Sequence, residues 1–453
     1  MTPTDNLYDF DLLLLDAIAL TADALRPEIR DCAIGIKDGR IAWRDNKLPE
    51  KFTAARTLRL PGHFITPGFV NTHTHSVLSM VRGVAADLGF APSYTPGIPK
   101  GTQVTPQQAR ALARLGALEA LLFGSTVLGD HFVHADVTTH AMAELGLRLC
   151  PSWRIHDVDF SKVAQGQWQH STAIGQSTLD AALQLHERWA NHPRVQVNLA
   201  AHAVDTCSND FLKEIAEISR LKGLVVSTHL GQSRTEVDRV LDRTGRTSTE
   251  VLEDAGLLNQ RLMGGHCIYL TVSDIAKMSN AGAHAVHIPK CNATSGRLAP
   301  THLLKAAGVN IALATDTQHG DMVELMRWAL MTARVQEGGV NDNWQPRHVF
   351  HMATLGGARA LGMHNKIGSI ELGKAADLVV FDGNRPHLRP HVNPLGNLVH
   401  TGQGRDVRMV MVDGDILVEH GLPTQVDMDS VCAEAETVAR ELWGHEGRHY
   451  WRL

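Results

Sequence analysis

Residues 64–75 read FITPGFVNTHTH, an apolar stretch that ends in His73 and His75. We expect a β-strand here, because a short apolar run bounded by turn residues is typical of a buried strand. Side chains two positions apart on a strand point to the same face of its sheet. Both imidazoles should therefore face one interior, at the carboxyl end of the strand.

Similar apolar stretches recur along the chain, separated by longer amphipathic patterns such as residues 109–123, ARALARLGALEALLF. Alternation of this kind predicts an α/β protein with a (β/α)8 barrel over residues 63–364. The further stretches are STVLGD (125–130), LRLCPSW (147–153), VQVNLAA (195–201), LVVSTH (224–229), RLMGGH (261–266), AHAVHIP (283–289) and NIALATD (310–316).

Both ends of the chain have a different pattern, with short strands and tight turns. Residues 33–45, AIGIKDGRIAWRD, carry an Asp38-Gly39 hairpin turn, and residues 367–383 and 407–421 repeat the pattern. We expect residues 1–62 and 365–425 to pair into one small β-sandwich domain. The remaining residues, 426–453, predict a helical tail.

The composition gives no indication of a nucleic-acid-binding protein, a membrane protein or a disulfide-linked protein. With 43% hydrophobic and 20% charged residues, the 453-residue chain has the composition of a soluble globular enzyme. Its net charge of -5 gives no reason to expect nucleic acid or an anionic membrane as partner. Acidic residues interrupt the apolar N-terminus, and the six cysteines form no CxxC pair. These features predict a reduced, cytoplasmic protein without a signal peptide or a membrane span.

Other barrel stretches also end in residues that can bind a metal. His229 ends LVVSTH, His266 ends RLMGGH and Asp316 ends NIALATD. Catalytic groups of such barrels lie at the carboxyl ends of the strands, so these side chains should meet His73 and His75. Imidazoles with one carboxylate suit a borderline divalent ion, which predicts Zn²⁺, with Fe²⁺ as the alternative.

The motifs in combination resemble the amidohydrolase superfamily, in its branch of atrazine chlorohydrolase, S-adenosylhomocysteine deaminase and guanine and cytosine deaminases. The resemblance spans nearly the whole chain and rests on PGFVNTHTH, the two later histidine strand ends, PKCNATSGRLAP, LATDT and IGSIELGKAADLVVFD. It implies that one metal is bound by His73, His75, His229 and Asp316. It also implies that His266 lies beside that metal, as a ligand or as a hydrogen-bond donor to water or substrate.

A mechanism follows from this resemblance. The metal would lower the pKa of its bound water, and Asp316 would accept the water proton and pass it to the leaving group. His266 would stabilise the charge that develops. We therefore expect a hydrolase that acts on a small nitrogenous compound, by deamination or by C–N hydrolysis of a heterocycle, amidine, amide or urea. The alternatives are displacement of another leaving group such as chloride, and a non-catalytic metal-binding relative.

Gln232 departs from the pattern of the deaminases, which carry a glutamate three residues after the fifth-strand histidine. Glutamine can donate and accept hydrogen bonds but cannot deliver a proton. Either Gln232 orients a substrate while Asp316 carries every proton, or the substrate needs no protonation of its ring. Both readings stay open at this point.

Further strand ends provide candidates for the wall of the substrate pocket. The predicted partner is a small molecule, and a homodimer is the candidate assembly. We predict substrate contacts for His202, Arg154, His156, His319 and Asn292, and Asp130 and His131 are further candidates for the wall.

Overall fold

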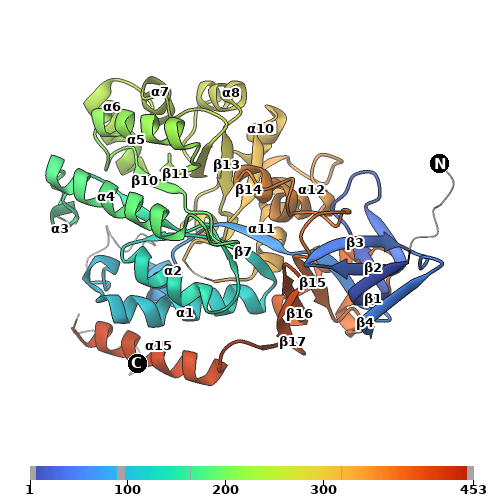
Figure 1. The fold of residues 1–453 in the computed structure, drawn as a ribbon. Helices are drawn as coiled ribbons and strands as arrows, with labels where there is room; N and C mark the ends of the chain where they lie inside the picture. Colours follow the sequence, from blue (N-terminus) through green and yellow to red (C-terminus); the bar gives the residue numbers. More distant parts are fainter. Residues whose placement is uncertain (1–6, 89–96, 164, 318, 446–453) are drawn as a thin grey trace.

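The computed structural model describes residues 7–88, 97–163, 165–317 and 319–445, which form a barrel and a smaller sheet (Figure 1). Residues 1–6 and 446–453 of the predicted end domains lie outside the described residues. In the described part of the chain, no helix is both long and apolar enough to cross a membrane.

The barrel consists of parallel strands whose order in the sheet follows their order in the chain. Its last strand meets its first through the bridge between Thr74 and Asp316 and through hydrogen bonds of the Asn71 side chain to Thr315. The predicted (β/α)8 barrel is therefore confirmed. Its described strands are β6 (Phe69–Thr74), β7 (Ser125–Phe132), β9 (Ser152–Ile155), β10 (Leu199–Ala203), β11 (Val226–Leu230), β12 (Leu262–His266), β13 (His284–His287) and β14 (Asn310–Leu313), with the short β8 (Arg148–Leu149) paired to β7.

The stretch FITPGFVNTHTH forms two strands, where the sequence predicts one. Residues Phe64–Pro67 (β5) belong to the small sheet, and β6 begins only at Phe69. Gly68 lies between them, at a position where a Cβ would lie 2.0 Å from the Thr126 hydroxyl oxygen. LRLCPSW is likewise divided into β8 and β9, and Pro151 lies between them.

Helices surround the barrel strands (Figure 1). The first, α1 (Pro106–Leu122), begins where the sequence favours a helix, since Thr105 caps the Gln108 amide and proline takes the first position. The others around the barrel are α2 (Ala135–Ala143), α3 (Phe160–Val163), α4 (Thr172–Trp189), α5 (Asn209–Lys222), α6 (Arg234–Thr244), α7 (Ser248–Asp254), α8 (Val272–Ala281), α9 (Pro289–Thr294), α10 (Thr301–Ala306), α11 (Met322–Gln336), α12 (Pro346–His351) and α13 (Gly357–Ala360). Two later helices follow, α14 (Pro394–His400) and the predicted tail helix α15 (Met428–His445), which packs on α1.

The small domain is built from both ends of the chain, as predicted, and its strands join in one sheet. The Asp38-Gly39 turn joins β2 to β3, and both turn residues have the positive φ angles, 48° and 72°, that such a hairpin requires. The strands are β1 (Tyr8–Leu20), β2 (Glu28–Lys37), β3 (Arg40–Asp45), β4 (Phe52–Arg59), β5, β15 (Leu378–Phe381), β16 (Val407–Val412), β17 (Asp415–Glu419) and β18 (Leu422–Pro423).

A buried ion pair joins the small sheet to the barrel. The Arg148 guanidinium, on β8, donates two hydrogen bonds of 3.0 Å to Asp377 and one of 2.7 Å to Asp413. The side chains of Arg148 and Asp377 are 1% and 2% exposed. The carboxylates come from the small-domain segments, so this contact fixes the sheet against the barrel.

Candidate metal centre

Histidines gather at the carboxyl ends of the barrel strands. One ring nitrogen from each of four buried histidines lies within 4.8 Å of the corresponding nitrogens of the other three. His73 and His75 come from the end of β6, His131 from β7 and His229 from β11. Such a group of neutral imidazoles has the chemistry of a site for a transition metal.

Backbone carbonyls orient two of these rings. His75 Nδ1 lies 2.8 Å from the His131 carbonyl oxygen, and His229 Nδ1 lies 2.6 Å from that of His202. A carbonyl oxygen only accepts hydrogen bonds, so Nδ1 carries the proton in both rings. Each Nε2 therefore keeps its lone pair for another partner.

His73 has no hydrogen-bond partner for either ring nitrogen among the described residues, although the residue is fully buried. A buried nitrogen without a partner is costly unless something else binds it. Burial, and then the neighbouring His131, keep the pKa of His73 well below its ordinary value, so the ring is neutral. The cluster therefore fits a metal ion by the chemistry of its donors.

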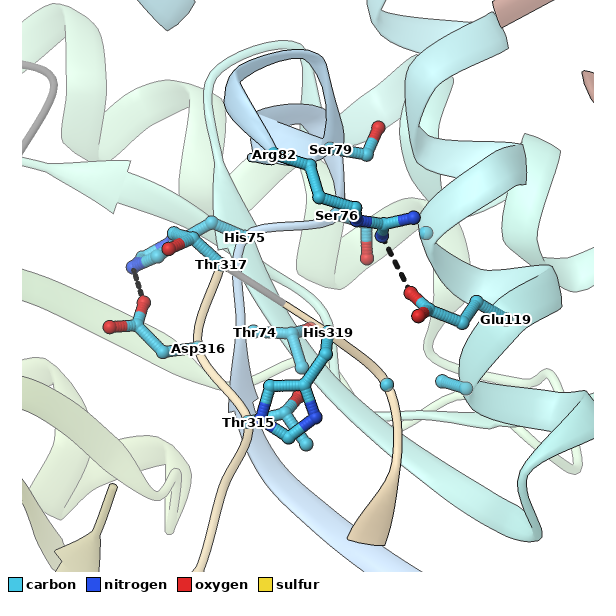
Figure 2. A pocket seen from close by; sticks show the side chains of 13 residues that line it. Thr74, His75, Ser76, Ser79, Arg82, Glu119, Thr315, Asp316, Thr317 and His319 are labelled. Carbon is cyan, nitrogen blue, oxygen red and sulfur yellow. Dashed lines mark hydrogen bonds and ion pairs between the residues drawn. The ribbon is translucent and has the colours of Figure 1, made fainter. Parts of the chain in front are cut away.

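Asp316 lies beside the cluster, three residues beyond β14. Its Oδ1 is 3.5 Å from His75 Nε2 and its Oδ2 is 3.8 Å from His266 Nε2. Figure 2 shows Asp316 and His75 turned toward each other. Burial raises the pKa of Asp316 to about 7.

Two residues of this centre adopt a left-handed backbone conformation, which side chains other than glycine rarely take. The φ angle is 61° at Asp316 and 67° at His266. Such conformations cluster at functional sites, where the surrounding structure holds them. His266 is held further because its Nδ1 lies 2.9 Å from Asn292 Oδ1.

A family model described as the amidohydrolase family matches residues 64–417. The chain belongs to the amidohydrolase family. The predicted metal-dependent hydrolase that acts on carbon–nitrogen bonds is thereby confirmed at the level of the family.

Individual relatives are similar to this amidohydrolase over nearly its whole length. A 5-methylthioadenosine/S-adenosylhomocysteine deaminase from Syntrophobacter fumaroxidans is 30% identical, and the match covers 95% of this chain and 98% of the relative. An adenosine deaminase from Xanthomonas campestris with bound zinc is 25% identical, with a TM-score of 0.87, and 96% and 99% of the two chains are covered. Atrazine chlorohydrolase from Arthrobacter aurescens shares the fold, at 21% identity and a TM-score of 0.85, over 94% and 100%.

The predicted substrate residues of this amidohydrolase divide into two groups. Arg154, His156 and His202 surround Phe160, and the Arg154 guanidinium lies 4.4 Å from the centre of that ring. His319 lies apart from these three residues and lines a cavity beside His75 and Asp316.

That cavity, of about 20 Å³, is lined by His75, Asp316, Arg82, Glu119 and His319 (Figure 2). Asn292, on α9, instead contacts His266. The structure therefore places Arg154, His156 and His202 together, apart from His319 and Asn292.

Gln232 lies just after β11 in a loop that rests on a buried carboxylate. Glu236 accepts hydrogen bonds from the backbone amides of Gly231 and Gln232, at 2.9 and 2.8 Å, and one from the Ser248 hydroxyl at 2.9 Å. Sequence reasoning missed Glu236, although its position three residues after Ser233 marks the start of a helix. The carboxylate fixes the backbone from which the Gln232 side chain extends.

We predict that this carboxylate makes stability depend on pH. Burial, and then the charge of Asp205, raise the pKa of Glu236 from 4.5 to about 7. Between these values the folded protein keeps a proton that the unfolded chain has released. The free energy of unfolding should therefore fall as pH rises through that window.

Denaturant unfolding of the wild type and of Glu236→Gln at several pH values tests this prediction. The variant cannot titrate at this position, so its stability should depend less steeply on pH between 4.5 and about 7. Parallel pH profiles for the two proteins would contradict the assignment.

Proposed function

We propose that this protein is a zinc-dependent hydrolase that deaminates a small amino-substituted heterocycle. The observation that carries the proposal is the buried imidazole of His73, which has no hydrogen-bond partner among the described residues. It lies among three other histidines, next to Asp316. The names of the relatives support it, since one is a deaminase of 5-methylthioadenosine and S-adenosylhomocysteine and another is an adenosine deaminase with bound zinc.

In this proposal His73, His75, His229 and Asp316 hold the metal, and His266 lies beside it. Zinc is favoured over Fe²⁺ because imidazole and carboxylate donors suit it and because the adenosine deaminase relative contains it. When bound, the ion lowers the pKa of its water, so that hydroxide is available near neutral pH.

Asp316 then accepts the proton of the attacking water and returns it to the departing amine. With Nδ1 donating to Asn292, His266 presents an unprotonated Nε2, 3.8 Å from Asp316. In this tautomer the His266 ring is neutral and its Nε2 carries no proton. Nε2 could therefore stabilise negative charge only after it had accepted a proton. We therefore propose that His266 assists Asp316 in moving the proton.

Gln232 restricts the substrate. Since its amide cannot protonate a ring nitrogen, we infer a substrate whose ring accepts negative charge without that proton, such as an electron-poor aminated ring. Arg154, His156 and His202 would contact this substrate on one side. Because Gln232 cannot protonate a ring nitrogen, the second candidate function is displacement of a leaving group other than nitrogen, such as chloride.

The test is a substrate panel with the fully zinc-loaded protein. The panel contains aminopurine nucleosides, electron-poor amino-heterocycles, their chloro analogues, amides and ureas, and it is assayed for ammonia and chloride. We expect ammonia from the electron-poor amines, loss of the activity with a chelator and its return with zinc. No turnover of any member would favour the non-catalytic alternative, and chloride alone would favour the second candidate.

Gln232→Glu serves as the companion variant in the same panel. We expect it to raise turnover of the aminopurine nucleosides relative to the electron-poor amines, because glutamate adds the missing acid. A rise in turnover of every amine, the best wild-type substrate included, would overturn the inference that this substrate needs no ring protonation.

A further inference from the structure

We propose that Arg154 is a catalytic residue whose guanidinium stabilises the negative charge that develops on the substrate ring, where Gln232 offers no acid. The inference rests on the proposed function and deepens it, because it gives a chemical role to a side chain that the proposed function uses only as a wall of the pocket. It also narrows the substrate class to aminated rings with a charge-accepting nitrogen or oxygen on the side of Arg154.

The register of the strands directs the Arg154 side chain into the barrel. Ser152 of β9 pairs with His131 of β7, whose ring belongs to the metal cluster. Residues paired across adjacent parallel strands point to the same face, and so do side chains two apart on one strand. Ser152 and Arg154 therefore both face inward. Arg154 is the last residue but one of β9, at the end of the strand where catalytic groups of such barrels lie.

Two aromatic rings hold the guanidinium beside the metal cluster. Its central carbon lies 5.3 Å from the centre of the Phe132 ring and 4.4 Å from that of Phe160. The Phe132 ring lies 5.8 Å from the His75 ring, and the Phe160 ring lies 5.0 Å from that of His202. Aromatic rings attract a cation through their electron-rich faces and leave its charge intact. The two rings thus place a permanent cation between the metal cluster and the wall of the pocket.

The two histidines of the same wall are neutral. Burial, and then the charge of Arg154, lower the pKa of His156 to about 3. Burial, and then the neighbouring His229, keep the pKa of His202 well below its ordinary value. A guanidinium, in contrast, keeps its positive charge at any pH at which an enzyme works. Of these three wall residues, Arg154 is therefore the one that can stabilise a negative charge without first taking up a proton.

The proposed reaction produces such a charge. Water adds its oxygen to the ring carbon that carries the amine, and an electron pair of the ring C–N double bond moves onto the ring nitrogen. Asp316 passes the water proton to the amine, which leaves as ammonia with the electrons of its bond while the ring C–N double bond forms again. Between these two steps the ring is negatively charged. Gln232 cannot protonate it, so the charge is stabilised electrostatically.

Arg154 and Gln232 lie on the same side of the barrel mouth. Their strands, β9 and β11, are both neighbours of β10 in the sheet, and Gln232 follows the end of β11. A ring that turns its charge-accepting edge toward Gln232 therefore turns it toward Arg154 as well. The cation stands where it can take over the task of the missing acid.

The first experiment compares kcat of three variants on the best substrate of the panel, at full zinc occupancy. Arg154→Gln removes the charge and should lower kcat by about 10²–10³-fold, the usual cost of losing one group that stabilises a developing anion. KM should change little, because the interaction strengthens only as the reaction proceeds. Arg154→Lys keeps the charge and should lose less than about 10-fold. In the control Arg327→Gln, an α11 arginine that donates to the Val399 and Gly402 carbonyls is removed, and kcat should stay at the wild-type value.

Equal losses in Arg154→Gln and Arg154→Lys would show that the charge itself is not needed, and they overturn the proposal. Wild-type kcat in Arg154→Gln does the same. If Arg154→Gln does not fold, Arg154→Lys decides at normal zinc content: a loss below about 10-fold supports the proposal and a larger loss overturns it.

Gln232→Glu provides a readout that a merely structural role of Arg154 would not move. Glutamate adds an acid that neutralises the same charge, so it should raise kcat of the Arg154→Gln variant by about 10-fold or more. In the wild-type background it should leave turnover of this best substrate unchanged. Absence of rescue in the double variant contradicts the proposal.

A binding measurement separates failure of this inference from failure of the proposed function. Calorimetry compares barbiturate, an oxo-heterocycle that is anionic at neutral pH, with uracil, a neutral ring of the same size. The preference of the zinc-loaded wild type for the anion should fall by about 10-fold or more in Arg154→Gln and persist in Arg154→Lys. An unchanged preference in Arg154→Gln overturns this inference alone, whereas a wild type that turns over no member of the substrate panel overturns the proposed function.

Discussion

Replacing Asp316 with asparagine is expected to lower kcat by about 10²–10⁴-fold at saturating zinc, the range that loss of one general acid–base group typically costs. Asparagine keeps the shape of the side chain, but it cannot accept a proton from water. Asp316 also contacts both His75 and His266, so its charge is central to the site. The measurement is steady-state turnover of the best substrate, with zinc content determined on the same samples.

Asp321→Asn is the matched control. Asp321 is also a largely buried carboxylate on the loop after β14, but it caps α11 by accepting the amides of Val323 and Glu324. Asparagine can cap a helix equally well, so kcat should stay at the wild-type value. Asp316→Asn with wild-type kcat at full zinc occupancy would remove Asp316 from the mechanism.

Arg148→Met is expected to lower the free energy of unfolding by about 3–5 kcal/mol, the usual cost of removing one partner from a buried ion pair. Asp377, 2% exposed, would lose the guanidinium that neutralises it, while methionine restores only part of the packing. Chemical denaturation monitored by circular dichroism measures the change.

Two comparisons make this prediction specific. The double variant Arg148→Met/Asp377→Asn leaves one fewer unpaired charge, so it should recover part of the lost stability. Arg220→Met removes an exposed partner of Glu217 and should change stability little. If Arg148→Met and Arg220→Met had the same free energy of unfolding, the buried ion pair of Arg148 with Asp377 would not hold the small sheet to the barrel.

The barrel and most of the site could be predicted because strand ends are visible in sequence. His73, His75, His229, His266 and Asp316 each follow an apolar run, and parallel strands bring such ends together. The break at Gly68 could not be predicted, because β5 belongs to the small sheet through its pairing with β15, which lies far away in the sequence.

The parts of the site that escaped prediction depend on contacts between distant segments. His131 is the last residue but one of β7, and its value as a donor arises only from the register with β6. Glu236 has the position of a helix-starting residue, yet its carboxylate turns back to the loop of Gln232. Asp205, whose charge acts on Glu236, follows a different strand. No local sequence pattern indicates that these two carboxylates lie near each other.

The seam of the barrel lies at the proposed metal centre. The backbone of Asp316 exchanges hydrogen bonds with His73 and His75, which joins the last strand to the first. An ion held by the proposed ligands would tie the same two strands together through their side chains. Because an ion that binds only the folded chain stabilises it, metal binding would then hold the barrel closed as well as supply its chemistry.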